Sequence, residues 1–199
     1  MTHSSIEKTS LILDSVIPHA RKLFRTFGYK KTTVDDIASG VFMSKKTLYA
    51  VFHSKEAILR ETIWRDTVET MRIFEATLPE GAASDKMILS LCRFIFTDRI
   101  KRGKKGYFWG LYSDDDDIRR VSREALKRII KALYEDGLER GLFKPVGTTI
   151  ATEHIVSMII AAVEHFSRDQ SPVRMFNDTL AMIADAVAYK NRIPYETMA

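Results

Sequence analysis

Residues 31–56 read KTTVDDIASGVFMSKKTLYAVFHSKE, and this stretch decides the fold. It contains three residues of the types that cap helix N-termini, Thr33, Ser44 and Ser54, spaced eleven and then ten residues apart. An acid, Asp36, follows Thr33 by three positions, as in a capping box. The spacing predicts two short helices, the second over residues 45–52, and then a long helix from Lys55 to about residue 78.

Upstream of this stretch, an apolar stripe at helical spacing predicts a first helix. The stripe consists of Ala20, Leu23, Phe24 and Phe27. Gly28 follows it and is a natural residue just past a helix end. Pro18 leaves two interpretations of the start: the helix begins near Ile17 after a separate arm, or it carries a kink there.

Downstream, apolar residues recur at spacings of three and four, and sustained strand alternation is almost absent, so the fold class is all-α. Further helices are expected at about residues 85–102, 114–140, 149–167 and 173–190, with an aromatic turn at 107–112. We expect an N-terminal three-helix domain over residues 1–53, a helical bundle over 54–190, and a flexible tail over 191–199.

Composition and charge narrow the class of protein. With 45% hydrophobic and 29% charged residues in 199, the chain resembles a globular protein and not a disordered one. It has no apolar run of about 20 residues and no signal-peptide pattern in residues 1–15, and its one cysteine cannot form an internal disulfide, so the cytoplasm is expected. Residues 1–55 hold nine Lys/Arg and four Asp/Glu, which accounts for the whole net charge of +5 and favours a polyanionic partner there.

Three segments in register carry a family resemblance: ARKLFRTFGY (20–29), KTTVDDIA (31–38) and SKKTLYAVFHSKE (44–56). From Val16 to Leu59 the chain resembles, without insertion or deletion, the helix-turn-helix of the tetracycline-repressor (TetR) family of transcriptional regulators. The remainder is similar only as a pattern of helices, with residues 134–143 resembling the turn before the family's last two helices. Phe42 departs from the family, which often has glycine there, and predicts a different or strained turn.

In a helix-turn-helix, the second helix enters the major groove with its N-terminal residues near base edges. With Leu48, Val51 and Phe52 turned inward, Lys46 and Thr47 lie at the leading end of the outward face and are our candidates for base contacts. The resemblance implies phosphate contacts for Tyr49 and Lys55. The full set of candidate DNA-binding residues is Thr33, Ser44, Lys45, Lys46, Thr47, Tyr49, His53 and Lys55.

Structural roles compete with each of these assignments. Thr33 and Ser44 would serve as caps in any helical protein, so DNA contact is an additional role for them. Tyr49 could pack half-buried against the domain, and His53 could be an ordinary solvated residue at a helix end.

The second domain is electrically neutral and rich in aromatic residues around the 103–106 loop, which is the composition of a mostly apolar ligand pocket. Core packing is the competing interpretation for each residue, and Cys92 could equally be a small buried apolar side chain or a redox sensor. The candidate effector-binding residues are Trp109, Tyr112, Phe96, Phe108 and Cys92.

Small and apolar residues on the last two helices exceed what one core needs and predict a homodimer. The candidate interface consists of Met158, Ala161, Ala162, His165, Phe176, Leu180, Ile183, Ala184 and Val187. Two Glu-His pairs, at 153–154 and 164–165, point to different helix faces and do not predict a metal site.

The sequence therefore predicts a DNA-binding regulator, a repressor released from a palindromic operator by a small-molecule effector, without cofactor and without membrane contact. A ligand-independent dimer, whose second domain only dimerises or recruits a protein, remains the alternative. An enzyme is disfavoured because the chain has no Gly-rich phosphate loop, no His-Glu-x-x-His and no Gly-x-Ser-x-Gly.

Overall fold

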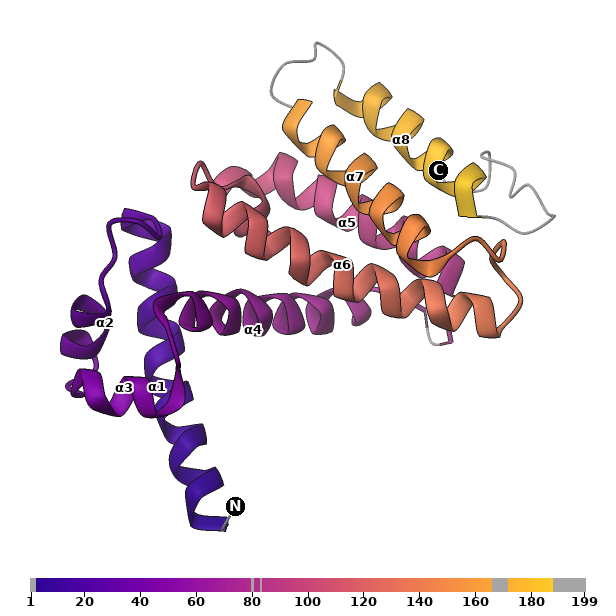
Figure 1. Cartoon of the computed structure of the whole chain (residues 1–199). Coiled ribbons are helices and arrows are strands. Elements are labelled where there is room, and N and C mark those ends of the chain that lie inside the picture. The colour runs from indigo at the N-terminus through magenta and orange to yellow at the C-terminus, as the bar shows by residue number, and fades with distance from the viewer. Residues whose placement is uncertain (1–2, 80, 83, 166–171, 188–199) are drawn as a thin grey trace.

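A computed structural model describes residues 3–79, 81–82, 84–165 and 172–187, and this part of the chain is all-α, as predicted (Figure 1). The N-terminal helices are α1 (His3–Phe27), α2 (Val34–Gly40), α3 (Lys45–Val51) and α4 (Lys55–Glu75). They are followed by α5 (Ser84–Arg102), the short 3₁₀ turns η1 (Gly103–Lys105) and η2 (Trp109–Tyr112), α6 (Asp116–Glu139), α7 (Thr148–His165) and α8 (Pro172–Val187). The tail expected over residues 191–199 lies outside the described residues.

All three predicted caps form. The side chains of Thr33, Ser44 and Ser54 accept hydrogen bonds from the backbone N–H groups three residues on, at 3.1 Å in each case. At α2 the capping box is complete, because the Thr33 N–H donates to Asp36 Oδ2 at 2.8 Å. Each cap satisfies helix N–H groups that would otherwise lack a partner and fixes where α2, α3 and α4 begin.

Helix α1 runs from His3 through Pro18 to Phe27 as one helix, so it does not begin near Ile17 after a separate arm, and the proline lies inside it as in the second interpretation. Pro18 lies on the exposed side, where the lost backbone hydrogen bond leaves a carbonyl open to water. Val16, Ile17, Ala20 and Phe24 are buried on the opposite side, and this burial holds the helix together across the proline. Gly28 ends α1 with φ 81°, the left-handed conformation expected of it.

The α2–α3 turn has the hydrogen bonds of a Schellman motif. The Phe42 N–H donates to Ser39 O at 3.2 Å, and the Met43 N–H donates to Ala38 O at 2.9 Å. Phe42 has φ 55°, in a position that glycine usually fills, and its side chain is 98% exposed. A left-handed conformation costs a non-glycine residue about 1–2 kcal/mol, so the strained form of the turn is the one this chain adopts.

Two apolar clusters form the core, and the first of them extends past residue 53, where the N-terminal domain was expected to end. One surrounds α1, α2 and α3 but also includes Ile58, Leu59 and Ile63 of α4 and Ile118 and Val121 of α6. The other fills the space between α5, α6, α7 and α8. Helix α4 crosses from the first cluster toward the second (Figure 1), so it serves as a rigid connection between the two parts.

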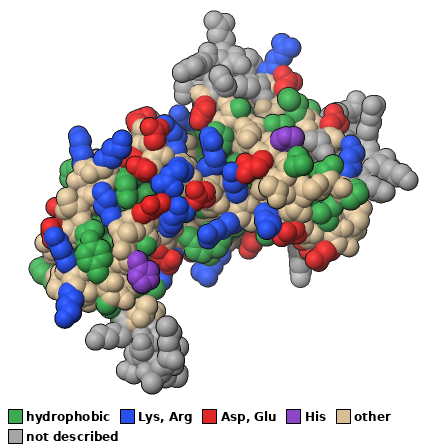
Figure 2. All heavy atoms as spheres, in the orientation of Figure 1, with side chains coloured by type: hydrophobic (Ala, Val, Ile, Leu, Met, Phe, Trp, Pro, Cys, Tyr) green, Lys and Arg blue, Asp and Glu red, His purple; other side chains and the backbone are tan. Residues whose placement is uncertain are grey.

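No helix within the described ranges has both the length and the apolar character that crossing a bilayer requires. On the face drawn in Figure 2, acidic and basic side chains intermingle along the middle of the molecule. Between α4 and α6, Arg60 pairs with Glu124, and Arg120 Nη2 lies 3.2 Å from Glu56 Oε1. These exposed pairs run between α4 and α6, and at such sites each contributes at most about 1 kcal/mol.

Candidate DNA-binding surface and junction cavity

The outward face of α3 presents Lys46, Tyr49 and Ala50 to solvent, while Leu48 is fully buried beneath them. Tyr49 is 47% exposed, so its side chain packs partly against the domain and partly faces solvent. His53 is exposed just beyond the end of α3. Lys46 has an exposed side chain at the leading end of the helix, where a base-edge contact requires it.

Ser44 and Thr47 are linked to each other at the start of α3. Their hydroxyl oxygens lie 2.8 Å apart, and Ser44 Oγ accepts from the Thr47 N–H at 3.1 Å. Thr47 is half-buried, unlike Lys46. The Thr47 hydroxyl is therefore oriented by the cap, which leaves its methyl group as the freer contact for DNA.

Lys45 and Lys55 both have partners within the protein. Lys45 Nζ lies 2.6 Å from Asp35 Oδ2 of α2, and this hydrogen bond raises the pKa of the Lys45 ammonium. Lys55 Nζ donates to the carbonyl oxygens of Tyr29 and Thr32 at 2.8 and 2.9 Å and lies 4.1 Å from the centroid of the Tyr29 ring. Lys55 therefore ties the α1–α2 turn to the start of α4, and one of its three N–H groups is left for a phosphate.

Thr33 is exposed at the start of α2, with its hydroxyl donating to Asp36 Oδ2 at 2.7 Å. The hydrogen bonds from the Thr33 side chain and backbone lower the pKa of Asp36. This carboxylate stands close to any phosphate that Thr33 would contact, and it weakens the case for a phosphate there.

Asp66, in the middle of α4, joins the two parts of the chain. Its Oδ1 pairs with Arg21 Nη2 of α1, and its Oδ2 accepts from Trp109 Nε1 of η2 at 2.8 Å. The Asp66 side chain is only 12% exposed. Three elements thus meet at one carboxylate, and the hydrogen bond to Asp66 directs the indole N–H of Trp109 toward α4.

We predict a pH-dependent contribution of Asp66 to stability. Burial raises its pKa more than the Trp109 hydrogen bond and the Arg21 charge lower it. Because the pKa is higher in the folded than in the unfolded chain, ionisation costs more in the folded state, so the contribution of Asp66 is largest below its unfolded pKa and falls as pH rises through the folded one. Urea unfolding between about pH 4 and pH 7 should show the Asp66→Asn variant gaining stability relative to the wild type as pH rises. A difference that is independent of pH would contradict this.

Asp115 makes a second link across the junction. Its Oδ1 caps α6 by accepting from the N–H groups of Asp117 and Ile118 at 3.0 and 3.3 Å. Its Oδ2 accepts from the Tyr29 N–H at 2.8 Å, just after α1. One side chain therefore fixes both the start of α6 and the turn that leads into α2.

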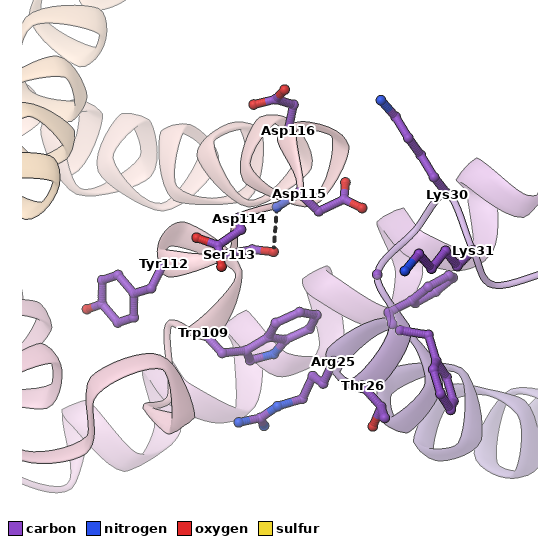
Figure 3. Close-up of a pocket in the computed structure, with 13 residues that line it drawn as sticks. Arg25, Thr26, Lys30, Lys31, Trp109, Tyr112, Ser113, Asp114, Asp115 and Asp116 are labelled. Atoms are coloured by element: carbon purple, nitrogen blue, oxygen red, sulfur yellow. Dashed lines mark hydrogen bonds between the residues drawn. The ribbon is translucent and has the colours of Figure 1, made fainter.

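A cavity of about 490 Å³ lies beside Asp115 and Trp109, and Figure 3 shows the residues around it. Trp109, Tyr112 and the Asp114–Asp116 segment line it from the bundle, while Arg25, Lys30 and Lys31 line it from the first domain. The Arg25 guanidinium lies 5.3 Å from the centroid of the Trp109 ring. The cavity is large enough for a small molecule, but it has charged groups of both signs where the sequence predicted a mostly apolar lining.

The predicted effector residues are not all brought together. Trp109 and Tyr112 line the junction cavity, and the Tyr112 hydroxyl donates to Ile95 O at 2.9 Å. Phe108 instead borders a cavity of about 20 Å³, which has room for about one water molecule. Phe96 and Cys92 are fully buried in the bundle core, Phe96 packs 4.7 Å from the Phe176 ring, and burial raises the pKa of the Cys92 thiol to about 12.

Sequence reasoning missed the junction side of this cavity. From the sequence, the Asp114–Asp117 run indicates only the start of the helix expected at 114–140, and the pattern does not single out Asp66. Arg25, Lys30 and Lys31 were counted only as part of a basic excess. Asp66 lies three residues after Ile63 and seven after Leu59, so its place on the inward side of the helix was the available signal for burial.

The predicted dimer residues divide into buried and accessible ones. Ala162, Leu180 and Ile183 are at most 8% exposed and belong to the core of their own chain, which removes them from a candidate interface. Met158, Phe176 and Ala184 are half-buried against that core, and Ala161 is exposed on α7. The side chains of His165 and Val187 lie outside the described residues.

The glutamates of the two Glu-His pairs form ion pairs within the protein. Glu153 lies 2.5 Å from Lys127, and Glu164 lies 3.9 Å from Arg123.

Comparison with known proteins matches residues 16–62 to the model of bacterial regulatory proteins of the tetR family. The HTH-type transcriptional regulator YhgD of Bacillus subtilis is 27% identical over 85% of this chain and 89% of its own length. The negative regulator IcaR of the biofilm operon in Staphylococcus epidermidis is 25% identical over 76% of this chain and 80% of its own length.

Solved structures show the same fold. RolR in complex with resorcinol has a TM-score of 0.66 at 17% identity, covering 93% of this chain and 91% of its own. A tetR-type regulator from a Shewanella species has a TM-score of 0.61 at 19% identity, covering 89% and 98%. Residues 16–62, which hold α2 and α3, therefore match the tetR family model, and the chain as a whole is similar in sequence to HTH-type transcriptional regulators and in fold to tetR-type structures.

Proposed function

We propose that this protein is a sequence-specific DNA-binding transcriptional repressor that acts as a homodimer and releases its operator when a small molecule binds. The observation that carries DNA binding is the exposed outer face of α3, where the Lys46 side chain is exposed and Tyr49 is half-exposed above a buried Leu48. This helix is anchored by a cap, a buried leucine and the Lys45–Asp35 pair, so its outer face is held rigidly for the major groove.

The test is selection of DNA sequences from a random pool, followed by anisotropy titrations at several salt concentrations. A dimer should select an inverted repeat whose half-sites are separated by about one helical turn. Equal binding to the selected and scrambled DNA would contradict the proposal.

Effector control is supported by the junction cavity, because it touches α1 on one side and the start of α6 on the other. A ligand there would change the orientation of the N-terminal helices relative to the bundle, and thereby the spacing of the two α3 helices in a dimer. A thermal-shift screen with small aromatic and charged metabolites should find a ligand that quenches Trp109 fluorescence and lowers operator affinity. A change in tryptophan fluorescence that survives the Trp109→Phe substitution would place the site elsewhere. A screen in which no compound shifts the melting temperature would favour the ligand-independent alternative.

The homodimer is a prediction of its own. We place the contact on the accessible side of α7 and α8, around Ala161 and Met182, which is 60% exposed. Light scattering at micromolar concentration should give about twice 22.8 kDa. Ala161→Arg should give a monomer, because an arginine cannot fit where two helices pack closely, whereas Ile100→Arg on α5 should remain a dimer. A monomeric wild type would contradict this proposal.

A further inference from the structure

Phe42 occupies a left-handed turn position at which folding alone would favour glycine. It has φ 55°, and the Schellman hydrogen bonds around it require only backbone groups. Its side chain is 98% exposed, so the phenyl ring adds almost nothing to the apolar core. Local strain combined with an exposed aromatic ring indicates a role outside folding.

The position of this ring suggests what the role is. Phe42 precedes Ser44, the cap of α3, by two residues, and it therefore lies beside the leading end of the helix that carries Lys46. Figure 1 shows the α2–α3 turn at the end of the molecule that is farthest from the α5–α8 bundle. An approaching duplex that meets the start of α3 meets this turn as well.

Resting on the proposed DNA-binding function, we propose that Phe42 is a specificity-determining residue whose ring contacts a thymine methyl group in the major groove. A phenyl ring has no hydrogen-bonding group and no charge, so it gains nothing from a phosphate oxygen. The C5-methyl of thymine is the apolar group that base edges present in that groove, and phenylalanine is among the side chains that contact it. Phe42 thus reads a thymine next to the base pair that Lys46 reads.

The test compares thymine with deoxyuracil, which lacks only the methyl group. The wild type is first used to select an operator, and each thymine is then replaced in turn by deoxyuracil. At one symmetric position, binding of the wild type should weaken by roughly fourfold per half-site, the value of one buried methyl-sized group. The Phe42→Gly and Phe42→Asn variants should bind the thymine operator as weakly as the wild type binds the uracil operator and should not distinguish the two.

Thermal unfolding separates this effect from misfolding. Both variants relieve the left-handed strain, so their melting temperatures should be equal to or above that of the wild type. Ile100→Ala, which removes another exposed apolar side chain, should leave operator binding unchanged. If the variants retain full affinity, or lose it equally on thymine and uracil DNA, Phe42 does not read a methyl group and the proposal is overturned. A wild type that selects no sequence would overturn the proposed function itself, which is a different outcome.

Discussion

Replacing Lys46 with alanine should lower affinity for the selected operator by about 10²-fold or more. A good contact to a guanine edge is worth about 1–3 kcal/mol, and a dimer loses two of them. Anisotropy titrations on operator and on scrambled DNA should show the loss mainly on the operator. This side chain is exposed at the start of α3 and has no role in the core, so the melting temperature should not change.

Salt dependence distinguishes base from phosphate contact for Lys46. If it reads a base, the slope of log K against log salt should stay nearly constant, whereas loss of two phosphate contacts would flatten it by about 2. Lys101→Ala on α5 removes the same charge far from α3 and should leave both affinity and slope unchanged. A uniform loss on all sequences, with a flatter slope, would show that Lys46 binds the backbone.

Replacing Asp115 with alanine should lower the free energy of unfolding by about 2–4 kcal/mol. The α6 cap is worth about 1 kcal/mol, and the Tyr29 N–H, left half-buried without its acceptor, costs a further 1–3 kcal/mol. Urea unfolding monitored by tryptophan fluorescence measures the loss. Ser54→Ala, which removes a cap without a junction bond, should cost only about 1 kcal/mol.

Asp115→Asn separates the two contributions. Asparagine is an equally good cap, but its NH₂ group would then face the Tyr29 N–H, so the junction bond is lost while the cap is kept. The close approach of Asp115 to this turn needs glycine at position 28, because a Cβ there would lie 3.0 Å from Asp115 Oδ2. An Asn variant as stable as the wild type would show that the Tyr29 bond contributes nothing.

Local features of the fold could be predicted because their causes are local. The caps at Thr33, Ser44 and Ser54, the end of α1 at Gly28 and the strain at Phe42 each depend on a few neighbouring residues. The path of α1 through Pro18 could not be predicted in this way, because burial of Val16 and Ile17 against other helices outweighs the proline penalty.

The contacts between α1, α4 and η2 could not be predicted from sequence patterns. Asp66 pairs with Arg21 and Trp109, which lie 45 and 43 residues away in the chain, and helical periodicity does not specify which helix a face meets. For the same reason, the apolar stripe with Leu180 and Ile183 could be assigned to a dimer contact when it fills its own core. A stripe predicts burial without naming the partner.

Because Cys92 is deeply buried, the reactivity of this single thiol reports how often the bundle opens. A maleimide or disulfide reagent reacts with thiolate at the surface, and this thiol is 0% exposed with its pKa raised to about 12. Modification must therefore wait until α5 separates from its neighbours, and the rate of modification measures how often it does. Any compound that tightens the bundle would slow this reaction, without a dye or an engineered residue in the protein.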